Sequence, residues 1–287
     1  MKICILIPSY KRNRELFRLL GQIRALKDSY EGSNQYTILV ADSDPINLQA
    51  TDIEENCDQR IINPGNGFDE NIKNYFLNYA MDFDWTFSIS DDDLFSLASI
   101  HPFEIIDTAT RSKAEVVIFN HIDFRSTNNG KINLLNRHYL EPKLSLDSNF
   151  LSAYFLRLLP RHVGLLYSRS AIIRSRPHFS LFNRTLHLYT IPVIQSSLER
   201  AVTFFDYPLC YFCVDQKSDG AWENNSLVFD GLLNFLVSLK TVLQPEYYLI
   251  AKEGFLVNYL GTNSWLRRDL ADSGIRLRSE DEILRLL

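Results

Sequence analysis

The amino-terminal part of the chain alternates short apolar runs with amphipathic helical segments, and this alternation constrains the fold most strongly. The first run, Lys2–Pro8 (KICILIP), is typical of a parallel strand buried on both faces. Arg12–Lys27 then carries leucine and isoleucine at helical spacing. Further strands are predicted at Tyr36–Ala41, Arg60–Ile62, Trp85–Ile89 and Glu115–Phe124, with helices at Phe68–Met81 and Leu94–Thr110. The pattern predicts an α/β fold with a doubly wound, mostly parallel sheet and helices on both faces.

The second half of the chain is less regular. We predict strands at His162–Ser168 and Ala201–Val214, and between them a helix at Phe182–Glu199 that contains Pro192. From Asn225 onward the spacing is helical. Because no repeat or low-complexity linker divides the chain, we expect one domain over residues 1–222, with halves at 1–125 and 126–222. A helical extension over residues 223–287 would pack on that domain.

Composition places the chain among ordinary globular proteins. It has 287 residues, of which 46% are apolar and 23% charged, and a formal net charge of −5. This charge gives no signal for nucleic-acid binding. The first apolar run is interrupted by Pro8 too early for a signal peptide, and no run is long enough to cross a bilayer. A cytoplasmic protein is the default expectation.

Two of the four cysteines, Cys210 and Cys213, form a CxxC pair inside a predicted strand. Residues three apart on a strand point to opposite faces, and the sequence has no second CxxC. We therefore expect buried or half-buried thiols, and keep a metal or redox role as a minor alternative.

Polar segments follow three of the predicted strands. Pro8-Ser9-Tyr10, Asp42-Ser43-Asp44 and Asp91-Asp92-Asp93 each begin where a strand ends. In a doubly wound sheet, ligands bind outside the carboxyl ends of the strands. The three segments are therefore expected to converge on one binding edge.

Three adjacent carboxylates repel one another, so Asp91, Asp92 and Asp93 need a partner. A helix cap needs only one aspartate. A divalent cation explains three better, because oxygen-rich sites suit Mg²⁺ or Mn²⁺, with substrate phosphates completing the coordination. We predict Mn²⁺ or Mg²⁺ as the cofactor.

The order of ILIPSYKR, VADSD, NGFDEN and WTFSISDDDLF resembles the GT-A nucleotide-sugar glycosyltransferases, specifically glycosyltransferase family 2. The resemblance covers about the first 125 residues well. It implies that the aspartate cluster is the family's DxD motif, which holds the metal on the donor diphosphate. Residues 1–125 would then be the nucleotide-sugar-binding half and residues 126–222 the acceptor-side half.

The resemblance also implies roles for residues along the nucleoside. Pro8, Ser9, Tyr10 and Arg12 match the loop after the family's first strand. Asp42 matches the acidic residue that bonds to the base or ribose. Gly67 and Asn71 match an element near the base, although a plain helix start explains these two residues as well.

The DxD motif has two possible registers. Relatives with D-x-D-D would align Ser90 with the first acid and match Asp92 and Asp93. Alternatively, Asp91 and Asp93 form the motif, because alternate residues of an extended segment share a face. All three aspartates remain metal candidates.

The resemblance predicts an inverting transfer, but the family's usual Glu-Asp pair, the source of its general base, is missing. The corresponding position lies near His187, whose imidazole has a suitable pKa for a base. An ordinary structural histidine is an equal alternative. Asp206, Asp215 and Asp219 are rival candidates.

Two further segments could contact substrates. In Gln216–Trp222 (QKSDGAW), Lys217 could face the diphosphate and Trp222 could stack on a sugar, or the segment is a plain exposed loop. Basic side chains crowd a second region and could meet a phosphorylated lipid acceptor or an anionic membrane surface, or form a solvated face with scattered ion pairs: Arg157, Arg161, His162, Arg169, Arg174 and Arg176.

The leading hypothesis is a metal-dependent enzyme that transfers a sugar from a nucleotide-diphosphate donor to a glycan or lipid-linked glycan. The family-level expectation is bacterial surface polysaccharide (O-antigen or capsule) synthesis in the cytoplasm, at the inner face of the plasma membrane. One alternative is a sugar nucleotidyltransferase, although PSYKRNRE lacks the glycine-rich loop that such enzymes use. A second alternative is a non-catalytic relative that binds nucleotide or glycan.

Overall fold

The computed structural model describes residues 1–44, 46, 49–63, 67–97, 100–126, 132–138, 162–182, 185, 187–213 and 225–256. Its strands are β1 (Lys2–Ser9), β2 (Gln35–Asp42), β3 (Gln59–Ile62), β4 (Trp85–Ser88), β5 (Leu94–Phe95), β6 (Val116–Ser126), β7 (Ile132–His138), β8 (Leu165–Ser168) and β9 (Val202–Cys213). Its α-helices are α1 (Asn13–Ser29), α2 (Ala50–Asn56), α3 (Gly67–Asn78), α4 (Pro102–Thr110), α6 (Arg169–Ser175), α7 (Ile191–Leu198), α8 (Asn225–Val242) and α9 (Pro245–Phe255). Short 3₁₀ segments are η1 (Ala80–Asp82), η2 (Arg176–Phe182) and η3 (Leu188–Thr190).

The described strands form one mixed sheet in the order β3-β2-β1-β4-β8-β6-β9-β5, with β7 paired to β6. β1 is parallel to β2 and β4, β2 to β3, and β6 to β9. β8 runs antiparallel to β4 and β6, and β5 and β7 are antiparallel to their partners. The predicted α/β class with a mostly parallel sheet is confirmed.

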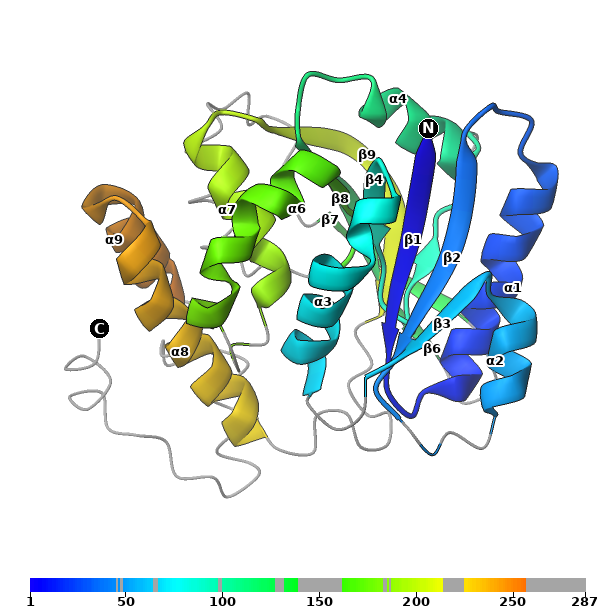
Figure 1. Cartoon of the computed structure of the whole chain (residues 1–287), viewed down its shortest axis with the longest axis horizontal. Coiled ribbons are helices and arrows are strands. Elements are labelled where there is room, and N and C mark those ends of the chain that lie inside the picture. Colours follow the sequence, from blue (N-terminus) through cyan, green and yellow to red (C-terminus); the bar gives the residue numbers. More distant parts are fainter. Residues whose placement is uncertain are drawn as a thin grey trace.

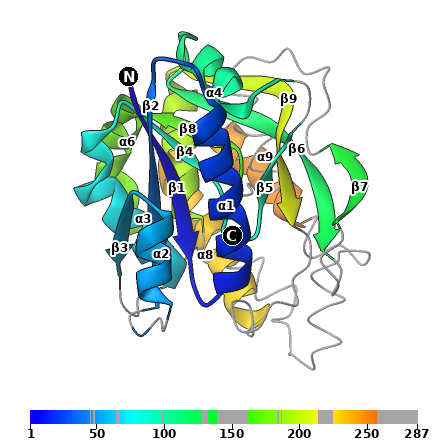
Figure 2. The ribbon, with the colours of Figure 1, turned by 90° about the vertical axis from the view of Figure 1, so that its right-hand side faces the viewer.

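Helices cover both faces of the sheet (Figure 1). The alternation of β1 shows why: Ile3, Ile5 and Ile7 pack in the apolar cluster with α1 and α4, whereas Cys4 and Leu6 pack in the cluster with α3 and α6. Figure 2 views the sheet from the α1 side, with α1 and α2 in front of it. A strand buried on both faces must be apolar throughout, as the KICILIP run is.

Two predicted helices are wrong at their amino-terminal ends. Within Leu94–Thr110, Leu94 and Phe95 form β5 against β9, and α4 begins only at Pro102. The proline occupies the first turn, where its missing N–H costs nothing, and the His101 side chain accepts a hydrogen bond from Phe103 N.

Among the described residues of Phe182–Glu199, only Ile191–Leu198 is α-helical, and the 3₁₀ segment η3 precedes it. Pro192 lies in the first turn of α7, where its missing N–H has no intrahelical partner to lose. His187 therefore precedes η3 rather than lying inside a helix. The short helix α2 was not predicted at all.

The four cysteines are free thiols, with Cys210 buried and Cys213 half-buried as predicted. None of the described helices combines the length and apolar character that spanning a bilayer requires.

Gly164 gives a direct test of the turn that leads into β8. Its φ of +67° is left-handed, and a Cβ atom there would lie 3.3 Å from the Phe119 carbonyl oxygen. We expect Gly164→Ala to lower the free energy of unfolding by about 1–3 kcal/mol, because both the backbone and the contact become strained. Gly21→Ala is the matched control: it lies on α1 with open space around it, and should raise stability by about 0.5–1 kcal/mol. Urea unfolding measures both changes, and equal effects would contradict the assignment.

Candidate functional site

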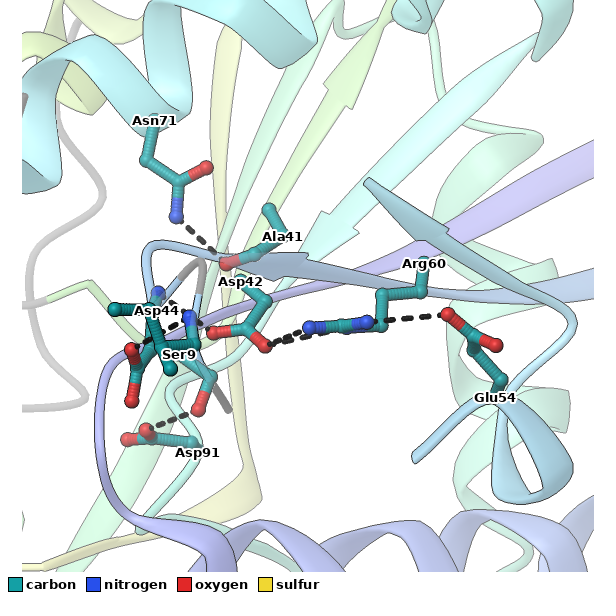
Figure 3. Close-up of polar contacts among 9 residues, drawn as sticks. Ser9, Ala41, Asp42, Asp44, Glu54, Arg60, Asn71 and Asp91 are labelled. Atoms are coloured by element: carbon teal, nitrogen blue, oxygen red, sulfur yellow. Dashed lines mark hydrogen bonds and ion pairs between the residues drawn. The ribbon is translucent and has the colours of Figure 1, made fainter. Parts of the chain in front are cut away.

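Three parallel strands bring the predicted polar segments to one edge of the sheet. In β1, Ser9 lies level with Asp42 of β2, and β4 runs parallel on the other side of β1. The chain leaves β4 at Ser88 and reaches Asp91 three residues later. Figure 3 shows the result: Ser9 lies between Asp42 and Asp91, which come from opposite neighbours of β1. The predicted convergence of these segments is present.

The aspartate cluster is tied to β1 and α1 by direct contacts. Ser9 Oγ donates a hydrogen bond to Asp91 Oδ2 over 2.9 Å (Figure 3). Arg12 Nη1 lies 2.6 Å from Asp92 Oδ2 and 3.3 Å from Asp91 Oδ1. Arg18 Nη2 donates to the Asp92 carbonyl oxygen at 2.9 Å. One guanidinium group therefore bridges two neighbouring carboxylates.

The third aspartate faces a different neighbour. Asp93 Oδ1 accepts a hydrogen bond from the backbone N–H of Cys213, at the end of β9, over 2.8 Å. Its other oxygen, Oδ2, is buried and has no hydrogen-bond partner among the residues that the structure describes. Such an acceptor is costly in a folded protein, and a cation or a donor from a ligand would relieve that cost.

Burial dominates the electrostatics of this cluster. It raises the pKa of Asp91 to about 7, with the Asp92 charge adding to the effect while Arg12 and Ser9 oppose it. Burial also raises the pKa of Asp92 and, more strongly, that of Asp93. The pKa of Arg12 is raised: burial opposes the shift, but the charges of Asp92 and Asp91 outweigh it. One arginine thus leaves the negative charge of the cluster incompletely balanced.

The cluster fits a divalent cation that shares its coordination with a ligand. In the described part of the chain, no group of three or more His, Cys, Asp or Glu side chains is arranged to hold a metal ion. Mg²⁺, however, commonly takes only one or two carboxylates, together with phosphate oxygens and water. The unpartnered Asp93 Oδ2 and the hard oxygen donors suit that kind of site.

Asp42 is a second acidic centre at this edge of the sheet. Its Oδ2 is 2.9 Å from Arg60 Nη2 and 3.2 Å from Arg60 Nε, so the guanidinium meets it with two nitrogens. Its Oδ1 accepts from the backbone N–H of Asp44 at 2.9 Å. Arg60 was not predicted as a site residue, because its contact with Asp42 depends on the pairing of β3 with β2.

Gly67 and Asn71 attach α3 to this edge. Gly67 begins the helix with a φ of +81°, a conformation that favours glycine. Asn71 Nδ2 donates to the Ala41 carbonyl oxygen over 2.6 Å, next to Asp42 (Figure 3). Pro8 lies in β1 opposite Ala41, and Tyr10 is 40% exposed just beyond the strand.

His187 is buried directly before η3. Its Nδ1 lies 2.7 Å from the Thr185 carbonyl oxygen, and its ring stacks near Tyr189 and Phe235. Burial lowers its pKa to about 4. An imidazole with such a pKa is neutral at pH 7 but weakly basic, which weakens its candidacy as a general base.

A carboxylate close to His187, that of Asp69 in the first turn of α3, accepts hydrogen bonds from Leu188 N and Thr185 Oγ1.

A buried pair that was not predicted from the sequence joins Ser88 to His162, with 2.6 Å between Ser88 Oγ and His162 Nε2. No sequence signal links these two residues, which are 74 positions apart.

The other candidates divide into two groups. Asp206 lies on β9, exposed, with its carboxylate accepting from Asn120 Nδ2. Asp215, Asp219, Lys217 and Trp222 lie outside the described residues, as do Arg157 and Arg161.

Three arginines of the predicted basic region already have protein partners. Arg169 pairs with Asp84 beside the amino end of β4, away from the aspartate cluster. Arg174 pairs with Glu115 and Glu199. Arg176 donates to two backbone carbonyl oxygens of α3.

Solved structures resemble this fold. TarS of S. aureus (residues 1–349, in complex with UDP-GlcNAc) matches with a TM-score of 0.64 and 11% identity, over 100% of this chain and 80% of that chain. The mannosyltransferase PcManGT of Pyrobaculum calidifontis, in complex with GDP-Man and Mn²⁺, matches with a TM-score of 0.53 and 9% identity, over 95% of this chain and 79% of that one. The chain therefore has a GT-A-like α/β fold. No protein-family model and no curated protein matches the sequence.

The buried His187 predicts a dependence of stability on pH. Its folded-state pKa of about 4 lies below the ordinary value, so the unfolded chain binds the proton more readily. Stability from this group is present above pH about 6.5 and is lost as the pH falls toward 4, by up to about 3 kcal/mol. His187→Asn should flatten the pH dependence of unfolding free energy in that window. His178→Asn, at a half-buried histidine, is the control. Parallel curves for wild type and His187→Asn would contradict the prediction.

Proposed function

We propose that this protein is a metal-dependent glycosyltransferase that moves a sugar from a nucleoside-diphosphate donor to a hydroxyl group. One observation carries the proposal: Asp91, Asp92 and Asp93, the first and last of them buried and Asp92 half-buried, lie incompletely neutralised at the carboxyl edge of a GT-A-like sheet. Asp42 lies at the same edge, on the other side of β1. The two acidic centres suit the two ends of one donor, with the diphosphate at the aspartate cluster and the nucleoside at Asp42.

The donor-side residues have separable tasks. Asp91, Asp92 and Asp93 would hold Mn²⁺ or Mg²⁺ together with the diphosphate oxygens, and Ser9 would orient Asp91. Arg12 would stay close to the diphosphate, where its charge stabilises negative oxygen atoms. Asp42 would accept a hydrogen bond from the base or ribose, and Pro8, Tyr10, Gly67 and Asn71 would shape the space around the nucleoside. When bound, the cation would offset the charge that develops on the leaving diphosphate.

The acceptor side of the proposal is a hydroxyl of a glycan or a lipid-linked glycan, attacked with inversion. A base must take the hydroxyl proton, and the candidates remain His187, Asp215 and Asp219. Lys217 and Trp222 would complete the site as a lid over the donor, with Trp222 stacking on a sugar. We further propose one catalytic domain over residues 1–222 with its extension at 223–287, acting in bacterial surface polysaccharide synthesis at the cytoplasmic face of the membrane.

A second candidate function is binding without transfer. It is favoured by the missing Glu-Asp pair, because the sequence near His187, where the resemblance predicts that pair, is RTLHLYTIPVIQ. The neighbouring Asp69 carboxylate accepts two protein hydrogen bonds there. Such a relative would bind the nucleotide and metal but would release no sugar.

Nucleotide binding is the first test. We expect calorimetric titration with UDP, GDP, CDP and dTDP to find one tight ligand, with affinity that rises at least about tenfold when Mn²⁺ is added, because cation and diphosphate bind as a pair. Transfer is then tested by incubation with the matching nucleotide sugar and detection of released nucleoside diphosphate. Binding without release would favour the second function, and no binding of any nucleotide would refute both.

The aspartate cluster is tested by Asp93→Asn, which keeps the shape of the side chain and removes its charge. We expect it to reduce the Mn²⁺-dependent part of nucleotide affinity by about tenfold or more, because a buried anionic oxygen is lost. Stability at pH 8 should not fall, since burial raises the pKa of Asp93 and its ionisation opposes folding. Asp52→Asn, at an exposed carboxylate on α2, is the matched control. Unchanged metal dependence in the Asp93 variant would exclude this residue from the metal site.

A further inference from the structure

We propose that Arg60 is a positioning residue for nucleotide selection, and that Glu54 in turn positions Arg60. The inference rests on the proposed function, because it concerns how Asp42 would meet the nucleoside. Figure 3 shows the chain of contacts, which runs from Glu54 through Arg60 to Asp42 at the sheet edge. Arg60 would act through Asp42 rather than by touching the nucleotide.

The strand register explains how Arg60 reaches Asp42. β3 is parallel to β2, with Val40 opposite Arg60 and Asp42 opposite Ile62. Arg60 thus lies two residues before the position level with Asp42, and alternate residues of a strand share one face. The long arginine side chain extends along that face to the carboxylate, where two of its nitrogens lie 2.9 and 3.2 Å from Asp42 Oδ2.

Glu54 holds the other end of the guanidinium. Glu54 Oε1 lies 3.1 Å from Arg60 Nη1, and the glutamate side chain, on α2, is 59% exposed. The side chain of Arg60 is only 4% exposed, and the side chain of Asp42 only 1%. The planar guanidinium therefore lies between one buried and one exposed carboxylate. These two contacts fix its orientation, which the single ammonium group of a lysine could not provide.

A purely structural reading of this ion pair is weak on energetic grounds. A buried salt bridge often adds little net stability, because removing both charges from water costs as much as their attraction returns. The pair also lies at the end of the sheet where the strands open toward the proposed site, rather than in the middle of the core. The charge is therefore better explained by a requirement on Asp42 than by a requirement of the fold.

Asp42 is also connected to the diphosphate side of the edge. Its Oδ1 accepts from Asp44 N, and Ser43 N donates to the Ser9 carbonyl oxygen at 2.9 Å. Ser9 Oγ then donates to Asp91. By fixing Asp42, Arg60 fixes the start of the loop after β2 relative to the aspartate cluster, and so sets the spacing between the two ends of a donor.

The arrangement has a consequence for selectivity. A carboxylate accepts hydrogen bonds and donates none, so an Asp42 side chain oriented by Arg60 favours a base or ribose that presents N–H or O–H groups to it. A nucleoside that lacks such a donor forms no hydrogen bond with this carboxylate and is bound more weakly. Arg60 should therefore affect the choice among nucleotides more than the affinity for diphosphate.

The experiment compares dissociation constants for UDP, GDP, CDP and dTDP with Mn²⁺ in wild type and variants, by calorimetry. In Arg60→Met, the ratio between the weakest and the tightest nucleotide should shrink by about tenfold, mainly through weaker binding of the tightest. Arg60→Lys should restore part of the ratio, and Glu54→Gln should reduce it by about threefold. Adding Arg60→Met to Asp42→Asn should change the ratio no further, because both act through one carboxylate.

Lys27→Met is the matched control. It removes a half-exposed ion pair with Asp58, away from this edge, and should leave every dissociation constant unchanged. If Arg60 has only a structural role, Arg60→Met should weaken the binding of all four nucleotides equally, or should lower only the melting temperature of the protein. If Arg60→Met does not fold, Arg60→Lys and Glu54→Gln decide, since Glu54 is largely exposed.

The outcomes separate the two proposals. A wild type that binds none of the four nucleotides refutes the proposed function, and the role of Arg60 falls with it. A selective wild type whose ratio is unchanged in the Arg60 and Glu54 variants overturns the Arg60 inference alone. Equal affinity of the wild type for all four nucleotides also overturns it while leaving the glycosyltransferase proposal intact.

Discussion

Buried negative charge at the carboxyl edge of the sheet is the constraint on which the rest of the site depends. Asp42, Asp91 and Asp93 are each at most 3% exposed. Carboxylates in such surroundings must be paired, bonded by donors or protonated. The chain supplies arginines from two different places, Arg12 directly before α1 and Arg60 on β3, to meet this requirement. The positions of α1 and β3 relative to β1 and β2 are thus tied to the electrostatics of the edge as well as to apolar packing.

The order of the strands creates this constraint. β1 is apolar along its length and pairs in parallel on both sides, so its neighbours β2 and β4 end beside it. The segments that follow β2 and β4 therefore begin at the same edge of the sheet. Residues that are 49 positions apart in the sequence, Asp42 and Asp91, become the two neighbours of Ser9 (Figure 3). The geometry of a parallel sheet, rather than any local motif, brings the acidic residues together.

The features that could be predicted from the sequence are those with a local period or a strong breaker. The apolar runs located β1, β2 and β4, and the polar segments after them located the edge. The Arg60–Asp42 and Ser88–His162 contacts could not be predicted, because each depends on how two strands pair or on a turn far along the chain. The helix start at Pro102 was missed because apolar spacing continued through residues that the proline keeps out of the helix. The start at Ile191 was missed because the same spacing runs through the 3₁₀ segment η3. No local sequence pattern near His187 identifies the general base. The aromatic rings of Tyr189 and Phe235, which lie beside His187, are part of the packed core.

The two acidic centres are neutralised in different ways, and this difference assigns them different roles. Asp42 is met by two nitrogens of Arg60 and by a backbone N–H, so its orientation is set before any ligand arrives. In the Asp91–Asp93 cluster, one guanidinium bridges two of the three carboxylates, and burial raises the pKa of each aspartate. Asp93 Oδ2 has no hydrogen-bond partner among the described residues. A preorganised acceptor suits recognition, because little rearrangement is needed when the ligand binds. An under-neutralised cluster suits capture of a cation, because the protein gains more from added positive charge there than at Asp42. Under the proposed function, selection of the nucleoside and binding of the charged diphosphate would take place on opposite sides of a single strand, β1.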